Sequence, residues 1–425
     1  MSDRRRGQPA PARRRVAQAV RRATFGEHYL ALPAGRALIA TTGRIDDPAL
    51  TVVRGLAALW VFVYHAWLSV GPQLLLVGFG VHKLDLTPLA SAGWAGVDVF
   101  YVLSGFLLWQ VFDDWSGGRA TLPLARYAKR RALRILPPYY AQVALLALVG
   151  AMTTWVEPPS APALVTQLTL TQSFSYDYFQ AVNNVWWTLS IEAQFYVLLP
   201  LLAWAIKRVG WTAVVVAGLI TMLAWRVGAY HAYANAPIIE RVWILEQLPG
   251  RIDQFLFGML ASHVARSPNH RAARLRETIQ RTVSLRRAMV LFGPIALIAL
   301  AYLLHVNDFF LRYWAGHPWL YAWHTVSGIA VAASLLALTQ RPYGTSSTAV
   351  SRSLVAFGTI SYSFYLWHEI LLRWLGTWLK SSVGEATLGA LTLNFALGFP
   401  IALVVAYTWY AAFERPFLRA RARLR

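Results

Sequence analysis

Long apolar stretches alternate with short polar connections along most of this 425-residue chain. A helix rises about 1.5 Å per residue, so roughly 20 apolar residues cross the hydrocarbon core of a bilayer. The pattern therefore predicts an all-α integral membrane protein with about ten transmembrane helices. These predicted spans lie at 49–71, 93–112, 137–155, 185–206, 211–231, 243–265, 288–305, 318–339, 354–378 and 386–412.

The composition is typical of a polytopic membrane protein, with 57% hydrophobic and only 14% charged residues. The chain contains no cysteine, which excludes a disulfide framework, a cysteine metal site and a cysteine thioester mechanism. We also expect no metal site, because no compact ligand motif such as His-Glu-x-x-His occurs.

The net charge of +21 is distributed unevenly over the connections. Ten spans place alternate connections on opposite sides, and most of the 40 basic residues fall on the side that carries both termini. By the positive-inside rule, both termini are cytoplasmic. Because the basic residues flank apolar spans, we expect no nucleic-acid partner. The connections on the opposite side contain only these four basic residues: Lys83, Arg241, Arg312 and Lys380.

Three segments follow from this topology. Residues 1–48 form an arginine-rich cytoplasmic arm without the apolar core of a signal peptide, and we expect anionic lipid to attract it. Residues 49–417 form the membrane domain, and residues 418–425 form a short basic cytoplasmic tail. The preference for arginine over lysine points to a bacterial chain, and we therefore predict a multi-pass protein of the plasma (inner) membrane.

A histidine lies deep inside the first predicted span, and an arginine precedes it by eleven residues. Eleven helical residues turn through about three full turns, so Arg54 and His65 share one face and lie about 16 Å apart along the axis. Ionisable groups inside a membrane are functional by default. We therefore expect a cation near the cytoplasmic boundary and an imidazole at the reaction centre.

Four other spans carry ionisable residues to a similar depth: Asp98, Glu192, Asp253 and His368. Charged groups do not face hydrocarbon at such depth, so they must face one another or a hydrated cavity. Polar hydrogen bonds between helices are the alternative explanation for any single one of them. As a set, they predict a buried polar chamber.

A histidine shielded from bulk water and placed beside a carboxylate is suited to deprotonate a hydroxyl. We predict that His65 is this base, and either Glu192 or Asp98 would orient its ring. Asp98 has an equally good alternative role in holding a helix junction. The sequence does not distinguish a role of His65 as general base from a role as nucleophile that transiently carries a transferred group.

Several blocks of the chain resemble the acyltransferase-3 family of integral membrane O-acyltransferases. The segment from Arg54 to His65 is similar to the family's arginine, ten residues, histidine signature. Five further blocks follow in the family's order, at 93–106, 130–139, 187–196, 361–368 and 414–416. The resemblance spans residues 50–417 and matches the stand-alone form, without an appended hydrolase-like domain.

The resemblance implies transfer of an acyl group, with acetyl-CoA as the expected donor, to a hydroxyl of a carbohydrate, glycolipid or related acceptor. Coenzyme A carries several phosphate charges and is made in the cytosol, so arginines on the inner face would bind it. The candidates for this role are Arg54, Arg130, Arg131 and Arg134. Candidates for binding the acceptor or lining the cavity are Ser361, Tyr362, Tyr365, His368, Trp187, Tyr196, Arg251 and Asp253.

Two other functional classes fit the topology. One is a secondary transporter, which would favour internal repeats and paired broken helices; we find no convincing repeat between the two halves of the chain. The other is a polytopic membrane subunit without chemistry, in which replacement of His65 would have little effect. The sequence leaves open the acceptor, the acyl chain length and the oligomeric state.

Overall fold

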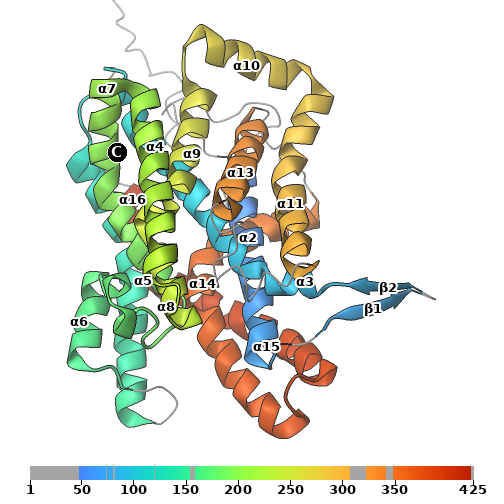
Figure 1. Ribbon diagram of the computed structural model, residues 1–425. Helices are drawn as coiled ribbons and strands as arrows, with labels where there is room; N and C mark the ends of the chain where they lie inside the picture. Colours follow the sequence, from blue (N-terminus) through green and yellow to red (C-terminus); the bar gives the residue numbers. More distant parts are fainter. Residues whose placement is uncertain are drawn as a thin grey trace, which may run out of the picture.

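The computed structural model describes residues 47–72, 74–79, 82–118, 120–153, 158–306, 322–340 and 348–422. Most of these residues are helical (Figure 1). The predicted arm at 1–48 lies almost entirely outside the described residues. The main helices are α2 (Pro48–Ser69), α4 (Gly96–Ser116), α5 (Leu124–Met152), α7 (Trp187–Ala232), α9 (Leu248–Arg266), α11 (Val283–Val306), α13 (Trp323–Thr339), α14 (Ala349–Val383) and α15 (Leu388–Trp409).

Shorter helices join the long ones. They are α3 (Thr87–Ser91), α6 (Ala161–Thr169), α8 (Ile238–Leu245), α10 (His270–Arg281) and α16 (Arg415–Ala422). One turn of π-helix, Tyr410–Glu414, separates α15 from α16. Single π-helical turns inside longer helices often mark functional positions.

Each predicted span overlaps a helix, although span 243–265 crosses the break between α8 and α9 at Glu246 and Gln247. Six of the described helices are long and apolar enough to cross a membrane, as expected for a multi-pass membrane protein. They are Pro48–Ser69, Gly93–Ser116, Leu124–Met152, Trp187–Ala232, Val283–His305 and Leu388–Ala420. The range of α7 covers two predicted spans, because the backbone leaves helical geometry at Gly210 (φ 84°, ψ 169°) and two helices meet at this kink.

One short hairpin interrupts the otherwise helical structure of the described residues. Strands β1 (Leu76–Phe79) and β2 (His82–Asp85) pair as an antiparallel hairpin between α2 and α3. This connection lies outside the apolar spans, where a hairpin satisfies backbone groups that no helix satisfies. In Figure 1 the hairpin projects from the bundle, and α10 lies at the opposite end.

The most extensive helix pairings join α2 to α14 and α4 to α9. Glycines allow the second of these contacts. A methyl group added at Gly105 or Gly258 would overlap the backbone oxygen of Phe255 or Val102, respectively. Helices that approach this closely fix one another's rotation, so α4 presents a defined face to α9 and another to the rest of the bundle.

Candidate functional site

A polar cavity of about 110 Å³ lies among α2, α4, α5, α7 and α14. Three guanidinium groups and one carboxylate contribute to its wall, together with hydroxyl and aromatic side chains. Its polar and aromatic lining consists of Arg54, Phe100, Tyr101, Ser104, Arg131, Arg134, Thr188, Glu192, Tyr196, Ser361, Tyr362 and Tyr365. The excess of guanidinium groups over carboxylates makes the cavity suitable for an anion.

Hydroxyl groups satisfy both carboxylate oxygens of Glu192. Ser104 Oγ donates to Glu192 Oε1 at 2.8 Å, and the Tyr196 hydroxyl donates to Oε2 at 2.5 Å. The Tyr127 hydroxyl in turn donates to the main-chain oxygen of Tyr196 at 2.9 Å. Glu192 is therefore fixed in the cavity wall by α4 and by its own helix, α7.

The three cavity arginines differ in their partners. Arg134 Nη1 lies 2.7 Å from Glu414 Oε1, and Ser363 Oγ donates to Glu414 Oε2 at 2.7 Å. Glu414 ends the π-helical turn and is fully buried. Within the part of the chain that the structure describes, the side chains of Arg54 and Arg131 form no hydrogen bond or ion pair. These two guanidinium groups can therefore bind an anionic ligand.

Two histidine rings face each other between α2 and α14. His368 Nε2 lies 3.3 Å from His65 Nδ1, and the ring centroids are 5.0 Å apart. His65 Nδ1 also lies 3.0 Å from the Val61 main-chain oxygen, and His368 Nδ1 lies 2.8 Å from that of Tyr365. A carbonyl oxygen only accepts, so each neutral ring carries its proton on Nδ1. His65 Nε2 is then a free lone pair.

Tyr365 connects the cavity to this histidine pair. Its ring lines the cavity, and its hydroxyl lies 2.9 Å from Thr188 Oγ1. Its main-chain oxygen accepts the hydrogen bond from His368 on the next turn of α14. The arginine-lined cavity and the histidine pair are therefore separated by one aromatic residue.

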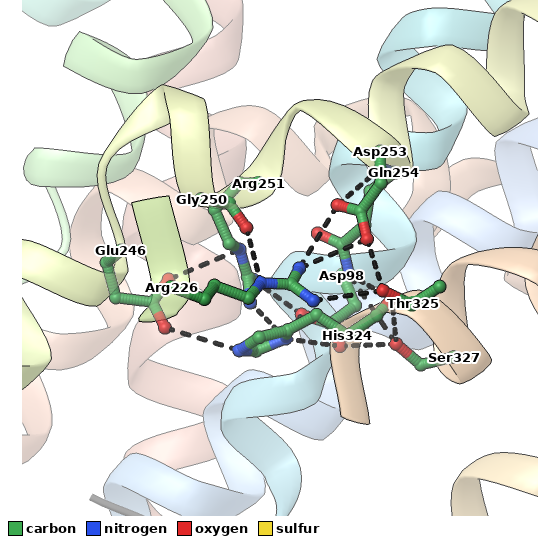
Figure 2. Close-up of polar contacts among 10 residues, drawn as sticks. All are labelled: Asp98, Arg226, Glu246, Gly250, Arg251, Asp253, Gln254, His324, Thr325 and Ser327. Carbon is green, nitrogen blue, oxygen red and sulfur yellow. Dashed lines mark hydrogen bonds and ion pairs between the residues drawn. The ribbon is translucent and has the colours of Figure 1, made fainter. Parts of the chain in front are cut away.

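A second set of ionisable residues forms a separate buried cluster (Figure 2). Arg251 Nη2 donates to Asp98 Oδ1 at 2.5 Å, and Ser327 Oγ donates to Asp98 Oδ2 at 2.7 Å. His324 Nδ1 lies 3.1 Å from both Asp98 oxygens and also contacts Arg251. Glu246 Oε2 lies 3.4 Å from Arg251 Nε. The cluster joins α4, α9 and α13.

The same cluster extends to α7 through a second ion pair. Arg226 Nη2 donates to both carboxylate oxygens of Asp253, at 3.2 and 3.1 Å. Arg226 Nε donates to the Gly250 main-chain oxygen at 2.9 Å, and Thr325 Oγ1 donates to Asp253 Oδ2 at 2.5 Å. All the charged side chains of the cluster are at least 95% buried. Ion pairs therefore join α4, α7 and α9, and hydrogen bonds from His324, Thr325 and Ser327 add α13.

Both predicted orienters of the His65 ring are corrected by these contacts. Asp98 belongs to the buried cluster and its oxygens contact Arg251, His324 and Ser327. Glu192 contacts Ser104 and Tyr196 instead. The side chain that meets the His65 ring is His368, which the sequence placed among the acceptor-binding candidates.

Four other predicted site residues lie away from the cavity wall. Arg251 and Asp253 are buried in ion pairs, so they do not line the cavity. The Trp187 ring packs against Phe179 at 5.2 Å between centroids. Arg130 precedes Arg131 on α5 and is not among the lining residues. Eight predicted residues do line the cavity: Arg54, Arg131, Arg134, Glu192, Tyr196, Ser361, Tyr362 and Tyr365.

Sequence reasoning missed several residues of both sites. Ser104 and Thr188 carry no charge, so their position in an apolar span does not identify them as site residues. Arg226 and His324 are ionisable and lie inside predicted spans, so the depth argument applied to them equally. In the described ranges, no group of three or more His, Asp and Glu side chains has an arrangement that would hold a metal ion.

Comparison with known proteins identifies a family whose model covers most of the chain. The acyltransferase-3 family model, described as an acyltransferase domain, matches residues 47–413. A protein of Komagataeibacter xylinus, named provisionally as a membrane-bound transacylase, is 26% identical over 341 residues, which cover 74% of this chain and 70% of that protein. No solved structure matches the chain.

Two further relatives match shorter segments. A protein of Acidianus two-tailed virus, named provisionally as an acetyltransferase, is 30% identical over 163 residues, covering 37% of this chain and 41% of the viral protein. A protein of Staphylococcus aureus strain COL, named provisionally as an O-acetyltransferase, is 25% identical over 168 residues, covering 36% of this chain and 24% of that protein. The matches thus span less than half of these two relatives.

Proposed function

Because the chain belongs to the acyltransferase-3 family, we propose that it is a membrane O-acyltransferase that moves an acyl group from acyl-CoA to a hydroxyl. One observation carries the proposal. The cavity holds Arg54 and Arg131, whose side chains have no hydrogen-bond or ion-pair partner among the described residues, and Tyr365 lies between this cavity and the His65–His368 pair. One helix bundle would therefore contain both a binding site for an anionic donor and a general base.

The donor in this proposal is acyl-CoA, and its phosphates would pair with Arg54 and Arg131. Guanidinium groups form bidentate, charge-assisted hydrogen bonds to phosphate. Arg134 is already paired with Glu414 and would add positive potential at the wall. Arg54 and His65 are eleven residues apart on α2, or about 16 Å along its axis. An extended pantetheine arm spans this distance, which would bring the thioester to the imidazole.

His65 serves as the base in this reaction. Its Nε2 takes the proton of the acceptor hydroxyl as the hydroxyl oxygen attacks the thioester carbonyl carbon. The carbon–sulfur bond breaks, the proton passes from His65 to the departing thiolate, and the products are an ester and free coenzyme A. If His65 instead carries the acyl group transiently, its Nε2 forms a bond to the thioester carbonyl carbon as the carbon–sulfur bond breaks, and the acceptor hydroxyl then displaces the imidazole.

The proposed acceptor is a hydroxyl of a carbohydrate, a glycolipid or a related molecule, and the proposed acyl group is short, such as acetyl. Two of the relatives carry names that specify acetyl transfer. Ser361 and Tyr362 also line the cavity, and their hydroxyl groups would bind the acceptor.

The proposed topology has ten membrane helices, with both termini in the cytoplasm of a bacterial cell and the protein in the plasma membrane. The basic helix α10 and the bend of α7 lie at one end of the bundle, whereas the hairpin and α6 lie at the other (Figure 1). Because cytoplasmic connections are rich in Lys and Arg, the end with α10 would face the cytoplasm, where acyl-CoA is made.

The donor role of Arg54 gives the experiment that tests this function. Arg54→Gln removes one of the two cavity guanidinium groups that have no partner in the described part of the chain, and a hydrogen bond to a charged group contributes about 1.5 to 3 kcal/mol. Titration of purified protein with acetyl-CoA is therefore expected to show a Kd about 10- to 100-fold above that of the wild type.

The matched control is Arg274→Gln. Arg274 is exposed on α10, lies at the same end of the bundle and does not line the cavity. This variant loses the same charge and should bind acetyl-CoA like the wild type. If both variants weaken acetyl-CoA binding equally, the change in net charge alone would explain the effect of Arg54→Gln. Absence of acetyl-CoA binding to the wild type would overturn the proposed donor.

A further inference from the structure

His368 is a buried polar residue that the proposed reaction does not yet use. Its ring is fully buried and lies parallel to Phe364, with 6.0 Å between centroids and 7° between planes. The hydrogen bond from its Nδ1 to the Tyr365 main-chain oxygen fixes the ring. That bond also leaves His368 Nε2 as an acceptor that points at His65 Nδ1.

Nearby carboxylates do not occupy this position. Glu192 and Asp98 have the partners described above. Glu369, the residue after His368, accepts a hydrogen bond from Asn184 at 3.1 Å and lies 3.8 Å from Arg373 Nε. The hydrogen-bond acceptor that faces the His65 ring from another helix is therefore the neutral imidazole of His368.

Close packing of α2 on α14 brings the two rings together. A methyl group added at Gly358 would lie 2.1 Å from the Thr51 main-chain oxygen, and one added at Gly376 would lie 2.7 Å from that of Ser69. These two contacts lie on either side of the histidine pair along both helices. The separation of the rings is thus set by main-chain contacts above and below them.

We infer that His368 is a positioning residue for His65, an inference that rests on the proposed function. His65 Nδ1–H is shared between the Val61 main-chain oxygen and His368 Nε2, which holds the ring with Nε2 unprotonated and correctly aimed. When His65 Nε2 takes the hydroxyl proton, its Nδ1–H bonds strengthen because the donor is now charged. The proton then leaves to the thiolate, and His368 keeps its own proton throughout.

Two substitutions at this position separate positioning from packing. His368→Phe keeps an aromatic ring against Phe364 but removes Nε2, the hydrogen-bond acceptor for His65. His368→Gln keeps an amide oxygen that reaches about as far as Nε2. The measurement is steady-state consumption of acetyl-CoA by the full-length protein in membranes that supply the acceptor, read as kcat and KM for acetyl-CoA.

The expected result is a split between the two kinetic constants. His368→Phe should lower kcat about 10-fold, the equivalent of one hydrogen bond. Its KM for acetyl-CoA should stay within about twofold of the wild type, because His368 does not line the cavity. His368→Gln should recover most of the lost kcat. A wild-type kcat in His368→Phe, or no recovery in His368→Gln, would overturn the inference.

A readout without turnover separates this inference from the proposed function. In ¹⁵N-histidine-labelled protein, the nitrogen resonances of His65 report which ring nitrogen carries the proton. We expect an Nδ1-protonated ring whose Nδ1 resonance shifts in His368→Phe. If the wild type consumes no acetyl-CoA but this shift occurs, the proposed function fails and the contact stands. An unshifted resonance would overturn the positioning role whatever the activity.

Discussion

His65→Ala is expected to lower acyl transfer from acetyl-CoA by about 100- to 10,000-fold, the range contributed by a well-placed general base. The substitution removes the Nε2 that would take the hydroxyl proton, and no histidine among the lining residues of the described cavity could replace it. Acetyl-CoA binding should persist, because His65 lies about 16 Å from Arg54 along α2. The measurement is release of free coenzyme A, with donor affinity determined separately.

A histidine outside the site provides the matched control. His231 is exposed near the end of α7, and His231→Ala should turn over like the wild type. Normal turnover by folded His65→Ala would remove His65 as the base. If His65→Ala loses both donor binding and turnover, the substitution damages the fold and does not report on the chemistry.

Asp98→Asn is expected to lower the free energy of unfolding by about 3 to 5 kcal/mol, the cost of breaking a buried ion pair by removing one partner. The substitution keeps the shape of the side chain but removes the charge that pairs with Arg251 at 2.5 Å. Arg251 would keep Glu246 at 3.4 Å as its remaining carboxylate. Thermal and denaturant unfolding of the purified protein in detergent measures the change.

An exposed pair provides the comparison for this stability effect. Glu277→Gln removes one partner of the Glu277–Arg281 pair on α10, whose side chains are 53% and 79% exposed. Such pairs contribute at most about 1 kcal/mol. Similar losses for both variants, or an unchanged unfolding midpoint for Asp98→Asn, would contradict the claim that the buried cluster holds α4, α9 and α13 together.

The sequence predicts depth along the membrane normal, because apolar length and charge distribution assign each residue a position within its span. On this basis, we predict that His65, Asp98, Glu192, Asp253 and His368 lie near one level. The structure sorts these five residues into three sites: the histidine pair, the arginine-lined cavity and the buried ion cluster. A predicted depth therefore does not identify the partners of a residue.

Partners depend on the rotation of each helix, which the sequence alone does not specify. Asp98 and Ser104 are six residues apart on α4, so they point about 120° apart around its axis. Asp98 therefore faces α9 and α13, whereas Ser104 faces Glu192 on α7. The rotation is set by contacts between distant segments, such as Gly105 and Gly258 at the α4–α9 crossing.

The His65–His368 contact joins residues that are 303 positions apart. Each histidine was singled out by its own span, but only the packing of α2 against α14 shows that they are neighbours. The hairpin β1–β2 was missed for a different reason. Its strands have only four residues each, too few for a periodic pattern to distinguish them from a loop.

The account as a whole depends on a donor that enters from the arginine-rich end and reaches His65 through the cavity. The most direct test uses sealed membrane vesicles of both orientations, with acetyl-CoA supplied only on the outside, because coenzyme A does not cross the bilayer. We predict release of free coenzyme A from inverted vesicles, which expose the cytoplasmic face. Equal rates in both orientations, or turnover confined to right-side-out vesicles, would contradict the account.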